Sequence, residues 1–199
     1  MDPQRRLITA VCLGGTAVAA MADAVARTRS LIAQSGAATA PSAVSAGEGS
    51  HDFDFLYGQW KIHNRRLKTW LAGSDEWIEF DGNLHCRPVL DGTGNVDEFT
   101  AVSQGIHGLS LRLYDPATRQ WSDYWVSKRS GVLNPAMVGA FSGGIGTFHG
   151  DDRYEGQQVR GRAIWTRRGT DEALWEQAFS ADDGKTWETN WTMRMIRQA

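Results

Sequence analysis

The sequence predicts an all-β protein whose main domain is a single antiparallel up-and-down β-barrel of about eight to ten strands. Apolar and polar residues alternate with a period of two through residues 51–197, and helical periodicity is almost absent. Turn-forming Gly, Pro, Asn and Asp separate the alternating runs, which indicates consecutive strands joined by short hairpins. A meander of this length avoids exposed edges most simply by closing into a barrel, and a β-sandwich is the alternative.

The barrel is predicted to begin at the stretch Phe53–Trp60. This stretch supplies an apolar lead-in, then Gly58, whose backbone can turn tightly, and then Trp60 as the first inward-facing residue of a strand. Ten candidate strands follow from the alternation. They are Gln59–Thr69, Glu76–Pro88, Asn95–Ser103, Leu109–Tyr114, Trp121–Ser127, Val138–Phe141, Ile145–Gly150, Gln158–Arg167, Ala173–Phe179 and Thr186–Ile196.

An export signal is predicted over residues 1–24. Arg5 and Arg6 precede an apolar run of small residues, and Ala22-Asp-Ala24 fits the small-x-small cleavage pattern. The protein is therefore expected to be periplasmic or secreted, and the paired arginines suit the twin-arginine route as well as the general one. Residues 25–50 are rich in Ala, Ser, Thr and Gly and lack aromatic residues, so we expect a flexible linker before the barrel domain at 51–197.

The charge and the cysteine count of the chain argue against several kinds of partner and against a disulfide. The net charge of -2 and the lack of a long basic stripe argue against nucleic-acid binding, and no stable membrane insertion is expected once the signal is removed. Cys86 is the only cysteine left after that removal, so no internal disulfide is expected. Cys86 lies in an alternating strand, which favours a buried, inert thiol over a nucleophile.

The segment Ser180–Trp187 reads Ser-x-Asp-x-Gly-x-Thr-Trp and resembles the Asp-box hairpin. In such a hairpin Asp182 would accept hydrogen bonds from turn donors, Gly184 would take a positive φ, and Trp187 would pack beneath. The motif occurs once and no blade-length repeat accompanies it, so we interpret it as a structural turn.

Five sequence blocks in order resemble an uncharacterised bacterial family of lipocalin-like (calycin) domains. They are Phe53-Asp-Phe-Leu-x-Gly58-x-Trp60, Leu90-Asp-Gly-x-Gly-Asn-Val-Asp97, Tyr114-Asp-Pro-x-Thr118-x-x-Trp121, Gly146-Thr-Phe-x-Gly-Asp-Asp152, and Trp175-Glu-Gln-Ala-Phe-Ser180 with Trp187-Glu-Thr-Asn-Trp191. The resemblance covers nearly all of 51–197. It implies a small lipocalin-like barrel around a cavity and an arginine of the last strand, Arg194 or Arg197, stacked on Trp60. It implies no assigned reaction.

Alternation counted from the tryptophans identifies the residues that face the interior. The row from Trp60 includes Asn64 and Arg66, and the row from Trp187 runs through Thr189 to Trp191. Polar residues in a largely aromatic interior are candidates to fix a ligand. The predicted ligand-binding residues are Asn64, Arg66, Asp123, Trp125, Trp165, Gln177 and Trp191.

Three functional hypotheses remain from the sequence. The first is a binding module for a small hydrophobic or aromatic molecule. The second is a cofactor-free enzyme, such as an isomerase, cyclase or lyase, in which Asp97 or Asp123 acts as base and Arg66 stabilises negative charge. The third is a filled barrel without a ligand, and the oligomeric state is left open.

Neither a metal nor another cofactor is expected. The five histidines lack metal-ligand spacing, and the glycine-rich segments join strand to strand rather than strand to helix. His149, Asp151 and Asp152 could form an acid-base cluster, but we interpret Asp151–Gly156 as a solvated turn.

Overall fold

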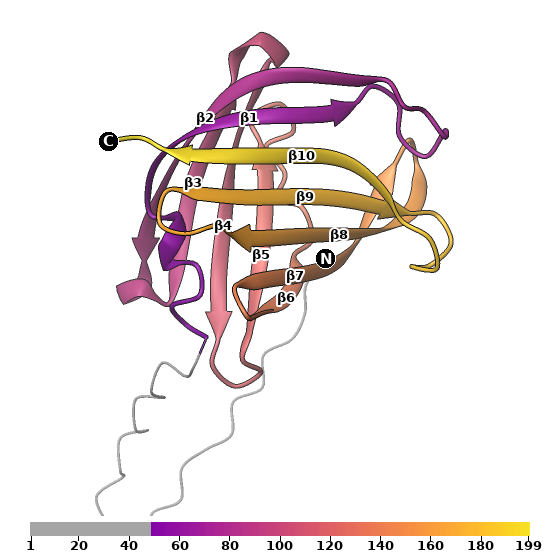
Figure 1. The fold of residues 1–199 in the computed structure, drawn as a ribbon. Coiled ribbons are helices and arrows are strands. Elements are labelled where there is room, and N and C mark those ends of the chain that lie inside the picture. The colour runs from indigo at the N-terminus through magenta and orange to yellow at the C-terminus, as the bar shows by residue number, and fades with distance from the viewer. Residues whose placement is uncertain (1–48) are drawn as a thin grey trace, which may run out of the picture. The chain divides into compact units, whose positions relative to one another are not determined.

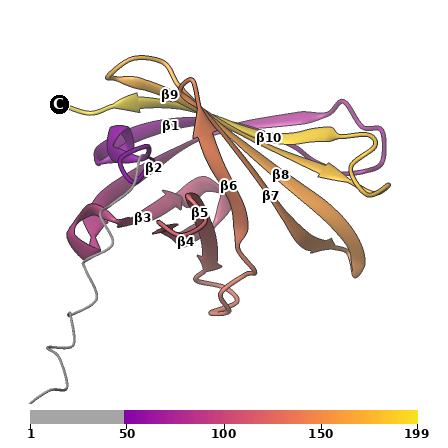
Figure 2. The ribbon, with the colours of Figure 1, turned by 90° about the horizontal axis from the view of Figure 1, so that it is seen from below.

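The computed structural model describes residues 49–199, which form a closed antiparallel β-barrel (Figures 1 and 2). Each strand pairs with its neighbours in the chain, and the last strand closes the barrel against the first. The predicted fold class is confirmed, and the sandwich alternative is wrong. The strands are β1 (Gly58–Leu67), β2 (Trp77–Val89), β3 (Gly94–Ala101), β4 (Ile106–Asp115), β5 (Gln120–Ser127), β6 (Met137–Ser142), β7 (Ile145–Tyr154), β8 (Gln157–Arg167), β9 (Glu172–Ser180) and β10 (Glu188–Arg197).

Three short 3-10 helices lie outside the strands: η1 (Asp54–Leu56), η2 (Leu90–Gly92) and η3 (Val102–Gln104). Figure 1 shows β8, β9 and β10 running across the front of the barrel, with β4 and β5 running steeply behind them. In Figure 2, β6 lies between the group of β3 to β5 and the group of β7 and β8. Among the described residues, no helix is long and apolar enough to cross a membrane.

The largest difference from the predicted strand bounds is in the hairpin of β7 and β8. Strand β7 continues to Tyr154 instead of ending at Gly150, and Tyr154 pairs directly with Gln157. The turn is therefore only Glu155-Gly156, and both residues have positive φ, of 50° and 83°. Such a two-residue turn keeps the strands paired to their ends. The interpretation of Asp151–Gly156 as a solvated turn is wrong for its first four residues, because they belong to the strand.

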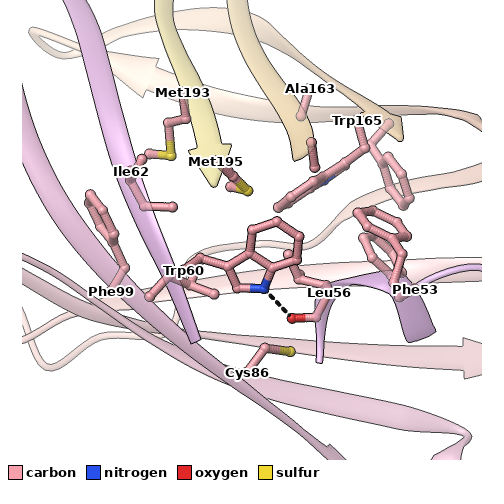
Figure 3. Packing of buried hydrophobic residues seen from close by; sticks show 14 of the residues in the cluster. Phe53, Leu56, Trp60, Ile62, Cys86, Phe99, Ala163, Trp165, Met193 and Met195 are labelled. Carbon is pink, nitrogen blue, oxygen red and sulfur yellow. Dashed lines mark hydrogen bonds between the residues drawn. The ribbon is translucent and has the colours of Figure 1, made fainter. Parts of the chain in front are cut away.

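One end of the barrel is closed by η1 and the start of β1. Phe53, Leu56 and Trp60 are fully buried there, and the Trp60 indole N–H donates to the Leu56 carbonyl at 2.7 Å (Figure 3). The Arg197 guanidinium lies 4.2 Å from the Trp60 ring centroid and donates to the Tyr57 carbonyl at 2.6 Å. These contacts join the first and last strands at this end.

The arginine that stacks on Trp60 is therefore Arg197 and not Arg194, which pairs with Glu172 in an exposed ion pair. Gly58 has a φ of 109°, and a Cβ there would lie 3.0 Å from Arg197 Nη1. A glycine at this position therefore relieves both backbone strain and a close approach.

The folded domain begins earlier than predicted. Ser50 is buried, and the Gly49 carbonyl accepts a hydrogen bond from the Trp121 indole at 3.0 Å. These two residues of the predicted linker thus belong to the barrel domain. The predicted export signal (1–24) and the rest of the predicted linker lie outside the described residues.

The turn before β10 is held by Asp182. Its carboxylate accepts from the Thr186 backbone N–H at 2.8 Å and from the Thr186 hydroxyl at 2.7 Å, while Gly184 has a φ of 87°. The Trp187 indole donates to the Gly184 carbonyl at 3.0 Å. The sequence predicts this arrangement of turn donors around Asp182.

A β-bulge interrupts the predicted inward row of β10. The pairing with β9 shifts between Thr189 and Trp191, and Asn190 is fully buried. Trp187 instead contacts the outward-facing residues Arg162 and His149, so its predicted inward orientation is wrong. The bulge inserts one extra residue, which changes the phase of the alternation on its N-terminal side.

Candidate functional site

The interior of the barrel holds a cavity of about 160 Å³. Its wall comes from β2 to β10, with Met137 contributed by β6, and its outer edge includes the exposed residues Asn134 and Pro135. The interior is therefore filled only in part, unlike the third hypothesis from the sequence. The lining combines aromatic and sulfur-containing side chains (Phe99, Trp125, Met137, Trp165, Trp175, Trp191, Met193, Met195) with polar ones (Asp97, Ser110, Arg112, Asp123, Asp151, Asp152, Gln177).

The aromatic side chains form a continuous wall. Trp175 meets Trp191 edge to face, with ring centroids 5.9 Å apart and planes at 83°, and it lies 6.4 Å from Trp165. Phe99 joins Trp125 and Trp191 at centroid distances of 6.5 and 6.4 Å. Tilted and edge-to-face contacts are favourable between aromatic rings, so this wall is a well-packed apolar surface.

A charged cluster lies deep in the cavity. Arg112 Nη1 of β4 is 2.5 Å from Asp97 Oδ2 of β3, and Arg112 Nε is 3.2 Å from Asp123 Oδ2 of β5. Nη1 also donates to Asn95 Oδ1 at 3.1 Å. The side chains of Arg112 and Asp97 are 3% and 0% exposed, and that of Asp123 is 14% exposed. Buried charges persist only when they are paired, and here one guanidinium is shared by two carboxylates.

The cluster shifts the pKa values of Arg112 and Asp123. Burial lowers the pKa of Arg112, but Asp123 and Asp97 outweigh it, so the pKa is raised overall and the guanidinium stays charged. Burial raises the pKa of Asp123, and the repulsion of Asp97 adds to the effect against the opposing attraction of Arg112. Asp123 is therefore a carboxyl group that takes up a proton more readily than an ordinary aspartate.

Two buried polar atoms at the cavity have neither a hydrogen bond nor an ion pair among the described residues. They are Asp97 Oδ1, an acceptor, and Trp165 Nε1, a donor. The Trp165 indole slightly lowers the pKa of Asp123, but its N–H does not have the geometry of a hydrogen bond. An unpaired buried polar group costs about 1–3 kcal/mol, so both atoms favour a complementary group in the cavity.

The outer edge of the cavity lies where β5 and β6 pair over a short length. Only Trp121–Asp123 pair with β6 there, and the loop 128–136 is held by a hydrogen bond of 2.8 Å from Asn134 N to the Trp125 carbonyl. Opposite lie Gly150 and Gly161, paired across β7 and β8. A Cβ on Gly150 would lie 3.0 Å from the Ala136 carbonyl oxygen, so glycine permits the close approach of this segment.

Asp152 lies at the same edge and faces the cavity. It pairs with Val159, a buried inward-facing residue, and its Oδ1 accepts from the backbone N–H of Arg153 at 2.7 Å. Burial raises the pKa of this carboxyl group. The neighbouring Asp151 points outward and pairs with Arg160 at 2.9 Å. The structure thus separates residues that the sequence analysis had treated as one turn.

Six predicted candidates line the cavity, and two do not. Arg66 lies over the rings of Phe80 and Trp191 at 5.5 and 5.2 Å, outside the lining. Asn64 is buried, donates to the Phe80 carbonyl and accepts from the Trp191 indole at 3.0 Å. The interior cation next to the carboxylates is Arg112, not Arg66 as predicted. The six in the lining are Asp97, Asp123, Trp125, Trp165, Gln177 and Trp191.

Sequence reasoning missed Arg112 because the polarity of β4 is inverted. Leu109, Leu111 and Leu113 face outward, while Ser110 and Arg112 are buried. The hairpin register contained the signal, because the turn at residues 116–119 places Tyr114 opposite Trp121 and hence on the inner face. Arg112 lies two residues before Tyr114, which is one full period of a strand, so it faces the same side.

No histidine lines the cavity, and no group of three or more His, Cys, Asp or Glu residues within 49–199 is placed to hold a metal ion. Cys86 is buried with its Sγ 3.7 Å from Asn95 Oδ1, and burial raises its pKa to about 12. A thiol that remains protonated in a closed site is a poor nucleophile, as the sequence analysis predicts.

Comparison with known proteins adds the fold alone. No protein-family model matches the sequence, and no curated protein matches it either. The structure is similar to the crystal structure of Rv2717c from M. tuberculosis, with a TM-score of 0.52 and 13% sequence identity. The match covers 77% of this chain and 99% of that chain. Fold and site together define a closed antiparallel barrel with an aromatic, carboxylate-lined internal cavity.

Proposed function

We propose that this protein is an exported binding module that holds a small apolar or aromatic molecule in the barrel. The observation that carries the proposal is the cavity of about 160 Å³, whose wall combines tryptophan rings with buried polar groups. Pockets of this composition bind small molecules, since the rings supply apolar contact and the few polar groups fix orientation.

The size of the cavity limits the ligand. An enclosed apolar cavity of about 150 Å³ accommodates benzene, so this one suits a single ring with a short substituent. A ligand of about eight heavy atoms that gains roughly 0.6 kcal/mol per atom would bind with a Kd of about 300 μM. Binding should therefore be measured at millimolar ligand concentrations.

A cavity-filling variant tests the proposal. Ala163 is buried and lines the cavity, whereas Ala140 is exposed on the outer face of β6. Ala163→Leu should weaken binding of benzyl alcohol or benzylamine at least about tenfold, because the new side chain occupies the site. Ala140→Leu makes the same change outside the cavity and should leave affinity unchanged.

Isothermal titration calorimetry and tryptophan fluorescence would measure both variants and the wild-type protein. Thermal melts would show that each variant is folded. Equal affinity in Ala163→Leu and the wild-type protein would place the ligand elsewhere, and no binding of any single-ring compound to the wild-type protein would refute the proposal.

A second candidate is the cofactor-free enzyme, an isomerase, cyclase or lyase. The observation in its favour is Asp123, whose raised pKa and place at the cavity suit a general base, with Arg112 beside it to stabilise developing negative charge. Asp123→Asn should then abolish turnover of a bound compound while binding persists. Product analysis by NMR after prolonged incubation would decide between a carrier and a catalyst.

The export part of the proposal has its own test. Mass spectrometry of the protein from the envelope of its native cell should find an N-terminus close to residue 25, because the cleavage pattern ends at Ala24. A pool that retains Met1 in the cytoplasm would contradict export. Replacing Arg5 and Arg6 by lysine should block only the twin-arginine route.

A further inference from the structure

We propose that the ligand of this cavity is an organic cation: a protonated amine or a quaternary ammonium group attached to a single ring. This inference rests on the proposed binding function and specifies its ligand class. It differs from the sequence-based expectation, in which an interior arginine would attract an anionic or carbonyl group.

The net charge of the side chains at the cavity is the first argument for a cation. Asp97, Asp123 and Asp152 face it, and Arg112 is the only lysine or arginine in its lining. Asp151 also belongs to the lining, but it is exposed and paired with Arg160, so the other three carboxylates and one guanidinium give a formal charge of -2. Arg112 already contacts one carboxylate through Nη1 and the other through Nε, at 2.5 and 3.2 Å. Its positive charge is therefore compensated within the protein, and an anionic ligand would meet uncompensated carboxylates.

The buried acceptor Asp97 Oδ1, which lacks a donor, is the second argument. Asp97 Oδ1 belongs to a side chain that is 0% exposed, and it has no hydrogen-bond partner in the described part of the chain. A carboxylate oxygen is an acceptor only, so its complement is a donor, and an ammonium N–H is the strongest donor a small ligand can supply. A quaternary ammonium group lacks such a donor and would satisfy the charge alone.

The tryptophan rings of the cavity wall, which can form cation–π contacts, are the third argument. Trp125, Trp165 and Trp175 line the same cavity, and the tryptophan face is the best aromatic partner for a cation. The protein already uses these contacts internally, since the Arg112 guanidinium lies 4.8 Å from the Trp165 ring centroid. A cation that loses its water needs both aromatic faces and carboxylates nearby, and this cavity provides both.

A neutral hydrogen-bond donor is the competing ligand class. A phenol or alcohol would complement Asp97 Oδ1, but it would leave the negative charge of the cavity unbalanced. Burial raises the pKa of Asp123, and a cation beside that carboxyl group would lower it again. A cation should therefore shift Asp123 toward its ionised form, so that any proton exchanged on binding is released, whereas a neutral ligand should cause no such release.

The test uses three ligands of matched size: benzylamine, benzyl alcohol and phenylacetate. Calorimetry at pH 7 should show benzylamine binding at least about tenfold more tightly than benzyl alcohol, and phenylacetate binding more weakly than both. Benzyltrimethylammonium should also bind, which would separate charge and ring contacts from hydrogen bonding. Titrations in two buffers of different ionisation enthalpy would measure the released proton.

Two variants locate the charge that matters. Asp123→Asn should weaken benzylamine about tenfold and abolish proton release, and Asp152→Asn should weaken it about threefold. Neither should change the affinity for benzyl alcohol. Asp75→Asn makes the same change at an exposed residue outside the cavity and should alter nothing. Asp152 is only half-buried and has no ion pair among the described residues, so its variant remains informative if Asp123→Asn fails to fold.

Each other result has a definite meaning. Equal affinities for benzylamine and benzyl alcohol would overturn the proposal of a cationic ligand and leave the binding function intact. Tightest binding of phenylacetate would assign Arg112 to an anionic ligand. No binding of any of the compounds would overturn both proposals, and equal weakening of both ligands in Asp123→Asn would make that residue structural.

Discussion

Tryptophans line both ends of the barrel interior, and the two ends use them differently. At the closed end, Trp60 and Trp121 are 1% and 0% exposed, and each indole N–H donates to a backbone carbonyl, at 2.7 and 3.0 Å. At the cavity, the Trp191 indole donates to Asn64 Oδ1 at 3.0 Å, but the Trp165 N–H has no partner among the described residues, and Trp175 is half-buried. A tryptophan whose polar edge is satisfied stabilises the fold, whereas one with a free edge and an open face can contact a ligand.

Truncation of one tryptophan from each end should give the largest difference. Trp60→Ala should lower the free energy of unfolding by about 5 kcal/mol, because it creates a cavity, removes a hydrogen bond and leaves Arg197 without its stacked ring. Trp175→Ala should cost only about 1–2 kcal/mol, since that side chain is half-buried at an existing cavity.

Urea denaturation would measure both losses, and calorimetry with benzylamine would measure affinity. Trp175→Ala should weaken binding although it costs little stability. Similar losses of stability in the two variants would show that the ends of the interior do not differ in packing. Unchanged affinity in Trp175→Ala would remove this indole from the binding surface.

The charged cluster provides a sharper test of the cavity. Arg112→Met should cost about 3 kcal/mol, because it leaves two buried carboxylates without their shared cation. The loss should depend on pH. Removing the guanidinium raises the folded-state pKa of Asp123 further above its unfolded value, so the folded variant binds more protons than the unfolded one.

The free energy of unfolding of Arg112→Met therefore falls as pH rises through the folded-state pKa of Asp123. The difference between Arg112→Met and the wild-type protein should therefore be smaller at about pH 5 than at about pH 8. Besides burial, the groups that contribute to the pKa of Asp123 are Arg112, Asp97 and the Trp165 indole. The variant removes Arg112 and leaves the other two in place. A loss that is equal at both pH values would show that packing, and not charge, determines the effect. Equilibrium denaturation at the two pH values would measure it.

The alternation of residues determined most of the fold in advance. All ten predicted strands exist, because period-two patterning and hairpin turns are local properties of the chain. The errors occur where local patterns are ambiguous. Trp187 faces outward because a bulge near Asn190 shifts the register, and the sequence carries no clear sign of a single inserted residue.

The site was less predictable than the fold for a physical reason. Five of the seven predicted ligand-binding residues line the cavity, since they share a face with a tryptophan. Which polar residues meet one another depends on the register of the paired strands, which places Arg112 directly opposite Asp123 in the β4–β5 hairpin, and alternation within a single strand does not give that register. Arg66 and Arg112 both face inward, but only Arg112 lies between the two carboxylates.

The smallest expected effect concerns Arg66. Arg66→Met should change the affinity for benzylamine by less than about twofold, because Arg66 does not line the cavity and its charge is half-buried beside Phe80 and Trp191. Its stability cost should be about 0.5–1 kcal/mol, the size of a partly exposed cation–π contact. Calorimetry and thermal melts on Arg66→Met beside Arg112→Met would compare the two arginines directly. A change in affinity of more than about fivefold in Arg66→Met alone would show that the binding site extends past Trp191 toward β1, and that the cavity is larger than its lining indicates.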